Sequence, residues 1–221
     1  TFAGNYTSTA SLDACSVTVN TGANVVFNSG HSLRVGENIT VNGTGTLIFE
    51  NNSALVQYTK HAVNTGNITV KRNSANMIRQ DYTAWGSPVS GQNLLAFSPN
   101  TLTNRFYQYL FTGTTTPTAY NSVNPTTNSF AIGKGYLIRA ENTMPSTTTT
   151  WNGKFTGTPN NGRINSNVIY GGSVGLGYNL VGNPYPSPIN IQEFIEGNNT
   201  TIESSCSIPD NQYKSVFCLN A

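Results

Sequence analysis

The chain has 221 residues, only 9% of them are charged, and its formal net charge is +2 at pH 7. This charge is far below that of the basic surfaces that bind nucleic acid, so we expect no nucleic-acid partner. No apolar run reaches the length of about 18 residues that a transmembrane helix needs, and we expect no membrane span. Polarity is carried by Asn, Thr, Ser and Gly, which favour strands and turns over helices. The composition therefore predicts an all-β, extracellular chain.

Residues 1–70 contain short apolar segments separated by Gly or Asn. The segments are 17–19, 25–27, 33–35, 39–41, 47–49 and 55–56. In most of them, two apolar side chains are two positions apart, a spacing that sends both to one face of a strand. Because the intervals are too short for helices and glycines supply corners, we predict a parallel β-solenoid over residues 1–70. Two or three hairpins of a sandwich are the alternative, since Asn42-Gly43 is also a hairpin turn.

The spacing of the apolar segments lengthens after residue 66, and we place a boundary near residue 70. The expected strands are 68–70, 106–110, 135–138, 151–155, 168–170 and 178–181. Long connections between such strands are typical of an antiparallel β-sandwich. We therefore predict a jelly-roll-like sandwich over residues 71–190, which ends where three prolines follow the apolar pair Leu180 and Val181.

Residues 191–221 form a separate C-terminal segment in this prediction. A helix of about two turns is expected over residues 189–196. Cys206 and Cys218 lie in the same polar segment, and a disulfide between them would restrict it. Cys15 is then the unpaired cysteine, and we expect it to be a buried free thiol; a bond to one of the other two or to another chain is the alternative.

The segment 216–219 (VFCL) is too apolar to be left in water. One interpretation is that a terminal segment completes the fold of a neighbouring copy or module and propagates a head-to-tail filament. The other is that residues 216–219 fold back as an edge strand of their own sandwich.

No motif for catalysis, metal binding or phosphate binding is present. His31 and His61 are far apart in the sequence, and no HExxH, CxxC, GxSxG or DxDxDG pattern occurs. The acidic residues are scattered, apart from the neighbours Glu193 and Glu196, which we interpret as exposed helix positions. We therefore expect no catalytic residue, no metal site and no cofactor.

Aromatic side chains are the remaining candidates for ligand binding. The chain has 11 Tyr and 2 Trp residues, whose rings could stack on sugars. Trp85 is the first candidate ligand-binding residue, followed by Tyr107, Tyr109 and Tyr120. For Trp85 the favoured alternative is a packing role in the core.

Three segments carry a family resemblance. They are DYTAWGSPVSG (residues 81–91), GKGY (residues 133–136) and GYNLVGNPYPSPI (residues 177–189). In sequence and order they resemble segments of secreted proteins of Bacteroidota that are exported by the type IX secretion system. The resemblance covers roughly residues 65–195 and implies a secreted or cell-surface location. Such proteins usually end in a sorting domain, and none follows Ala221; we expect that it has been cleaved off or that the chain is part of a longer protein.

The combined interpretation is a non-enzymatic module of a secreted or surface-attached bacterial protein. The resemblance implies an adhesive or structural role, as an adhesin or a subunit of a surface filament, with other copies or adjacent modules as partners. A carbohydrate-binding module with a glycan ligand is the first alternative. A carrier domain of a larger secreted enzyme is the second.

Overall fold

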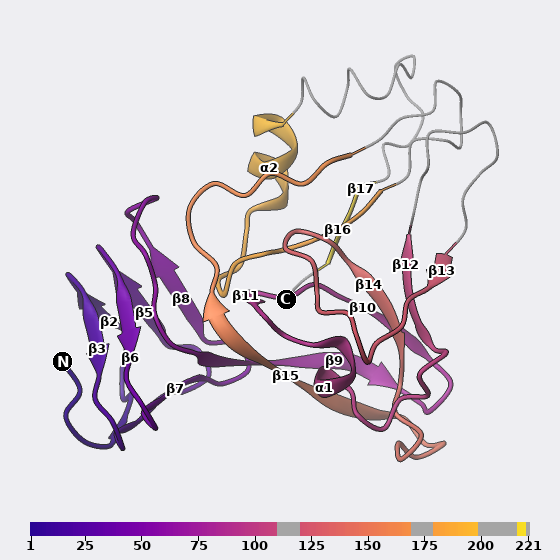
Figure 1. The fold of residues 1–221 in the computed structure, drawn as a ribbon, viewed down its shortest axis with the longest axis horizontal. Helices are drawn as coiled ribbons and strands as arrows, with labels where there is room; N and C mark the ends of the chain where they lie inside the picture. The colour runs from indigo at the N-terminus through magenta and orange to yellow at the C-terminus, as the bar shows by residue number, and fades with distance from the viewer. Residues whose placement is uncertain (110–119, 169–178, 199–215, 220–221) are drawn as a thin grey trace.

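The computed structural model describes residues 1–109, 120–168 and 179–198, together with the backbone of Val216–Leu219 (Figure 1). These residues form an all-β fold that contains parallel and antiparallel sheets, which confirms the predicted fold class. The solenoid section lies at one end of the molecule and a four-stranded sheet lies at the other, with a long strand pair running between them (Figure 1).

The solenoid consists of short parallel strands stacked in rungs. In chain order they are β1 (Tyr6–Thr7), β2 (Leu12–Ala14), β3 (Val17–Val19), β4 (Asn24–Phe27), β5 (Ser32–Val35), β6 (Ile39–Val41), β7 (Thr46–Phe49) and β8 (Ala54–Gln57). Strands β1 to β5 each pair in parallel with the strand one rung later, as β3 does with β6 and β4 with β7. Equivalent residues such as Asn24 and Thr46 are 22 positions apart. Hairpins would pair adjacent strands in antiparallel fashion, so the solenoid is confirmed over the hairpin alternative.

Alternate side chains of the solenoid strands fill its core. Val25, Phe27 and Phe49 are fully buried, and the rings of Phe27 and Phe49 stack with their centroids 5.4 Å apart. The chain turns between strands at positions such as Gly22 and Gly30, whose φ angles are 80° and 82°. This left-handed backbone favours glycine, which explains why glycines interrupt the apolar segments.

Strand β9 (Ile68–Met77) belongs to both sections. Its start pairs in parallel with β7, so it continues the solenoid sheet. Over most of its length it also pairs antiparallel with β15 (Thr149–Pro159), which in turn pairs with β11 (Val89–Ser90). The resulting six-stranded sheet has the order β1-β4-β7-β9-β15-β11. The boundary expected near residue 70 falls inside β9.

A second, antiparallel sheet packs on the far half of the β9–β15 pair. Its strands, in the order in which they pair, are β10 (Tyr82–Trp85), β14 (Tyr136–Arg139), β12 (Phe106–Tyr109) and β13 (Tyr120–Ser122). The ring of Trp85 on β10 lies 5.5 Å from Trp151 and 6.0 Å from Phe155, both on β15. The short helix α1 (Leu94–Phe97) adds Leu94 and Phe97 to the same core. Two sheets packed face to face form the expected sandwich.

The C-terminal part contains β16 (Asn179–Gly182), helix α2 (Ile191–Gly197) and β17 (Val216–Leu219). Helix α2 confirms the predicted helix, and the Asn190 side chain caps its start by accepting a hydrogen bond from the Gln192 amide. Strand β17 pairs in parallel with β16 of its own chain. Residues 216–219 thus fold back on their own chain, as the alternative expects, but they pair with β16 in a separate two-stranded sheet and not as an edge strand of the sandwich. The reason is that β16 offers an open edge within the same chain.

The cysteine predictions have different outcomes. Cys15 is a free thiol, but it is exposed, so the expected burial is wrong. It lies in the turn between β2 and β3, where its backbone carbonyl accepts a hydrogen bond from the Glu37 amide and its side chain points away from the core. The proposed disulfide between Cys206 and Cys218 concerns side chains outside the described residues.

The turn that follows β16 closes the last rung of the solenoid. The Leu55 amide on β8 donates a hydrogen bond of 2.9 Å to the carbonyl oxygen of Pro186. The guanidinium of Arg72, on β9, donates to the same carbonyl and to that of Ser53, at 3.4 and 3.0 Å. Burial lowers the pKa of Arg72 from its ordinary value, and these carbonyls replace part of its hydration. Arg72 thus joins the solenoid, the long strand pair and the turn.

We expect Arg72→Met to destabilise the fold by about 2 kcal/mol, because carbonyl oxygens of Ser53 and Pro186 lose a charged donor. Urea unfolding followed by tyrosine and tryptophan fluorescence measures the change. Arg79→Met is the matched control: Arg79 is exposed in the turn after β9, and its replacement should change stability by less than about 0.5 kcal/mol. Equal effects of the two substitutions would contradict the role given to Arg72.

Candidate functional site

Trp85 lies in the core of the sandwich and is only 4% exposed. Its ring makes edge contacts with Phe97 at 5.3 Å, Trp151 at 5.5 Å and Phe155 at 6.0 Å. A ring enclosed in this way cannot stack on a sugar. The prediction that Trp85 binds a ligand is therefore wrong, and the alternative of a packing role in the core is correct.

The three candidate tyrosines lie together on the outer face of the four-stranded sheet. Because Phe106, Tyr136, Ile138 and Trp85 are buried against the core, the residues that alternate with them point outward. We call this surface the tyrosine face, and it comprises Tyr82, Tyr107, Tyr109, Tyr120, Arg105 and Arg139. Strand pairing thus brings together side chains from β10, β12, β13 and β14.

The rings of the tyrosine face are arranged in two pairs. Tyr82 and Tyr107 meet edge to face with centroids 5.9 Å apart, and Tyr109 and Tyr120 do so at 5.5 Å. Tyr82 and Tyr120 are 39% and 43% exposed, whereas the other two are half-buried. The Tyr107 hydroxyl donates to the Asn104 carbonyl and accepts from Arg105, which holds its ring in place. The rigid sheet therefore presents fixed, partly open aromatic surfaces.

Tyr82 was missed as a candidate by the sequence analysis. It stands in the segment of residues 81–91, three positions before Trp85, so the two side chains point to opposite faces of β10. Because strand residues alternate between faces, a buried Trp85 predicts that Tyr82 points outward. Burial, followed by the neighbouring Tyr107, raises the pKa of Tyr82 above its ordinary value, so its hydroxyl is neutral at pH 7.

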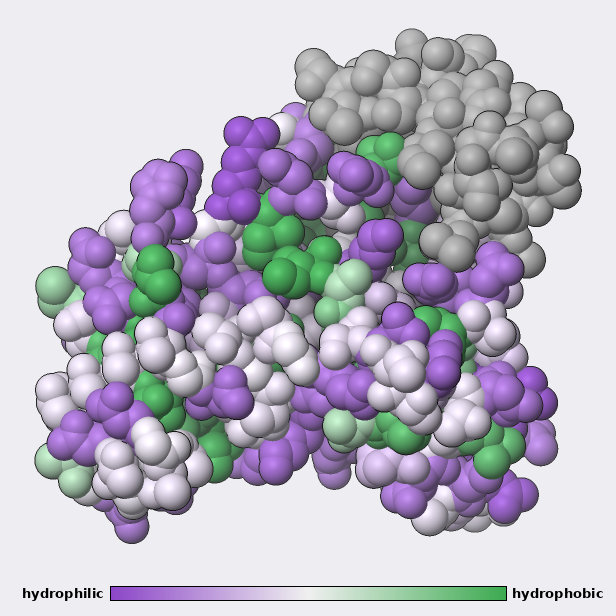
Figure 2. All heavy atoms as spheres, viewed as in Figure 1, coloured by the Kyte–Doolittle hydropathy of each residue, from purple (hydrophilic) through white to green (hydrophobic). Residues whose placement is uncertain are grey.

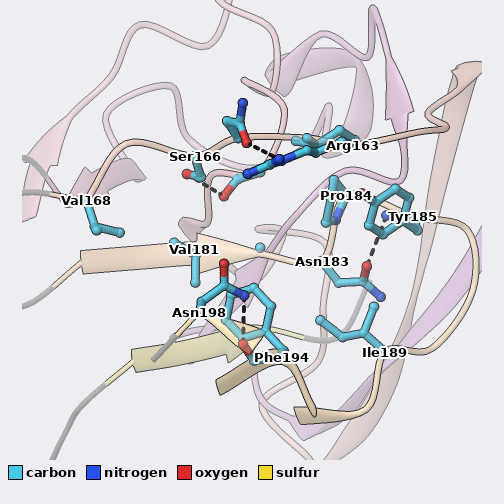
Figure 3. A pocket seen from close by; sticks show the side chains of 14 residues that line it. Arg163, Ser166, Val168, Val181, Asn183, Pro184, Tyr185, Ile189, Phe194 and Asn198 are labelled. Carbon is cyan, nitrogen blue, oxygen red and sulfur yellow. Dashed lines mark hydrogen bonds between the residues drawn. The ribbon is translucent and has the colours of Figure 1, made fainter. Parts of the chain in front are cut away.

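A pocket of about 450 Å³ lies between β16, α2 and the segment of residues 163–168 (Figure 3). Arg163 and Ser166 line one side, and Ile189 and Phe194 line the other. The polar groups bond within the protein: the Arg163 Nε–H donates to Asn165 at 3.2 Å, and the Ser166 hydroxyl donates to the Gly133 carbonyl at 3.3 Å. Its described lining includes no carboxylate, imidazole or thiol. This pocket can enclose a small molecule but offers no general acid or base of these kinds.

Residues of the segments 81–91, 133–136 and 179–189 meet beside this pocket. The Gly182 amide donates to the Gly133 carbonyl, and the Gly135 amide donates to the Leu180 carbonyl, each at 3.1 Å. Gly86 packs directly against Gly182: a Cβ on Gly86 would lie 2.7 Å from the Gly182 Cα. These residues form a backbone junction between β10, β14 and β16, so their role in this fold is structural.

Among the described residues, no three His, Cys, Asp or Glu side chains gather in a way that could hold a metal ion. The His31 imidazole is hydrogen bonded to the Ser8 hydroxyl at 2.7 Å. None of the helices in the described ranges is long and apolar enough to cross a membrane. The surface in Figure 2 is mostly polar or weakly polar, with apolar residues in small separate groups.

We expect Gly86→Ala to destabilise the protein by roughly 1–3 kcal/mol, because the added methyl group overlaps the Gly182 backbone and neither strand can move freely. Thermal unfolding followed by circular dichroism tests this. Gly4→Ala is the control, since a Cβ at Gly4 meets no atom within 4 Å. A Gly86→Ala variant as stable as the control would show that the two backbones can separate without penalty.

Comparison with curated proteins and with solved structures returns no match. A family model described as "Domain of unknown function (DUF8693)" matches residues 4–215. The match includes both the solenoid and the sandwich. The chain therefore belongs to the DUF8693 family of domains of unknown function.

Proposed function

We propose that this chain is a non-enzymatic binding module of a secreted or surface-attached bacterial protein, and that the tyrosine face is its contact surface. The observation that carries the proposal is the gathering of four tyrosines from three strands on one outer sheet face, with Tyr82 and Tyr120 both more than a third exposed. Adhesion is the role that the resemblance implies, and an outward aromatic face is a suitable means of adhesion.

A glycan is the ligand class that the chemistry of this face favours. Sugar rings present C–H groups on one face and hydroxyl groups at their edges, so they stack on tyrosines and form hydrogen bonds beside them. Ser122 lies opposite Tyr107 on β13, and Asn104 contacts Tyr107 from the preceding turn. A rigid sheet loses little conformational entropy on binding, which favours recognition without rearrangement.

A structural role remains a second candidate, supported by the first rung of the solenoid. Phe2, Tyr6 and Leu12 pack on the core but are only partly buried. We propose this partly buried first rung, and not β17, which pairs with β16, as the surface for head-to-tail contact with a second copy. The carrier-domain alternative has no comparable observation in its favour.

We expect a glycan array to identify ligands of the wild-type protein, and the double variant Tyr82→Ala/Tyr120→Ala to bind them about 30-fold more weakly. The estimate assumes about 1 kcal/mol for each exposed ring. Tyr58→Ala is the control, because Tyr58 is 65% exposed on the solenoid, away from the tyrosine face. If no glycan binds, or if the double variant binds as well as the control, the proposed contact surface is wrong.

For assembly, we expect light scattering to show a mass that rises with protein concentration and that returns to the monomer value in Leu12→Lys. A lysine at the first rung is hydrated in the monomer. It would lose this hydration under a second copy, which opposes the contact. Leu102→Lys, at a 43% exposed position of the sandwich, is the control. A wild-type protein that stays monomeric at millimolar concentration rules out this assembly.

A further inference from the structure

We propose that the tyrosine face recognises an acidic glycan, whose carboxylate or sulfate groups bind the arginine pair Arg105 and Arg139. The inference rests on the proposed function and specifies its ligand. It goes beyond aromatic stacking, which any sugar could use, because it assigns a charge to the ligand.

The two arginines are neighbours across strands β12 and β14. The Arg139 amide donates to the Arg105 carbonyl at 3.2 Å, and Arg139 lies opposite Tyr82 on its other side. Both residues alternate with buried ones, Ile138 and Phe106, so both side chains belong to the outer face. The two arginine side chains therefore leave the same outer face from opposed positions of neighbouring strands.

No acidic side chain compensates this positive charge within the described part of the chain. The ion pairs found there are Arg34 with Asp13 and Lys71 with Glu50, and neither includes an arginine of the tyrosine face. Arg105 donates instead to the Tyr107 hydroxyl at 3.2 Å, and Arg139 donates from Nη2 to the side-chain oxygen of Asn142. Two arginines on one outer face favour an anionic partner, and a ligand carboxylate or sulfate would supply it.

The hydrogen bonding of the guanidinium groups is also incomplete. The Nε atoms of Arg105 and Arg139 are buried, and neither has a hydrogen-bond partner among the described residues. A buried charged donor without an acceptor is unfavourable. Because the Nε atoms are enclosed, a bound oxyanion would accept from the Nη atoms of the same guanidinium groups.

The aromatic rings continue the surface from this charge in one direction along β12. Tyr82 pairs with Arg139 and its ring meets that of Tyr107, and Tyr109 lies two residues further along β12, about 7 Å away. A ligand that contacts both the arginine pair and Tyr109 would be a chain of sugars with an acidic unit over the arginines. Single-stranded nucleic acid could also stack there, but a net charge of +2 provides too little phosphate neutralisation to favour it.

The test compares ligands that differ in charge. Binding of the intact chain to polygalacturonate, its fully methyl-esterified form, chondroitin sulfate and oligo(dT) is measured by isothermal titration calorimetry. We expect binding to polygalacturonate or chondroitin sulfate, at least about tenfold tighter than to the neutral ester and weaker as salt is raised. These two ligands separate carboxylate from sulfate recognition.

Arg105→Gln and Arg139→Gln should each weaken acidic-glycan binding at least about fivefold, because a charge-assisted hydrogen bond is lost. Arg79→Gln is the matched control and should bind like the wild type. Arg139→Lys keeps the positive charge but not the planar guanidinium, and it should retain an intermediate affinity. A thermal melt of each protein shows whether the variants are folded.

Several outcomes would overturn the inference. Equal affinity for the polygalacturonate and its neutral ester, or unchanged affinity in the folded arginine variants, removes the charge requirement while leaving a glycan-binding tyrosine face in place. Binding of oligo(dT) without any acidic glycan assigns the face to nucleic acid instead. Absence of binding to every glycan, neutral or acidic, defeats both this inference and the proposed contact surface.

Discussion

The strand pair β9–β15 is the element on which the rest of the structure depends. The start of β9 is the last strand of the solenoid sheet, through its parallel pairing with β7, and the same strand then forms one layer of the sandwich with β15. One continuous hydrophobic cluster follows it, from Val17 in the solenoid to Phe155 in the sandwich. Because one continuous sheet and one core join the sections, neither can rotate against the other without breaking backbone hydrogen bonds.

The turn after β16 stabilises this arrangement from the other side. The Pro186 carbonyl takes the place of a further strand beside Leu55, and Arg72 holds the same carbonyl to β9. Gly86 and Gly182 allow the backbones of β10 and β16 to touch, where a side chain would separate them. The segments 81–91, 133–136 and 179–189 thus hold β16 and the turn after it in place, and this turn joins the sandwich to the solenoid. A structural task of this kind is compatible with many different activities.

The proposed binding surface follows from the same architecture. One face of the four-stranded sheet must be buried against β15, as Trp85, Phe106 and Ile138 are, and its alternate residues are then directed to solvent. Tyrosine suits such positions because its ring packs partly on the sheet and its hydroxyl remains hydrated. Arginine beside it adds positive charge without an acidic partner in the described chain. Core packing therefore fixes the position of the surface, and the choice of outward residues sets its chemistry.

The sequence by itself determined the solenoid strands, the all-β class and the helix α2. These features depend on local periodicity, glycine corners and an Asn cap, all of which can be read within a few residues.

Local pattern also placed Tyr107, Tyr109 and Tyr120 among the candidates, but not on one face. The tertiary structure decided that grouping. It also decided the strands β10 and β13, the outward position of Tyr82 and the exposure of Cys15. The expected strand at residues 168–170 is not seen at Val168, and its other two residues lie outside the described ranges. The pairing of β17 with β16 was also open in the sequence, since an apolar segment specifies that it must be covered but not by which edge. Each of these features depends on contacts between residues far apart in the chain, and the local pattern of a strand does not encode its partner.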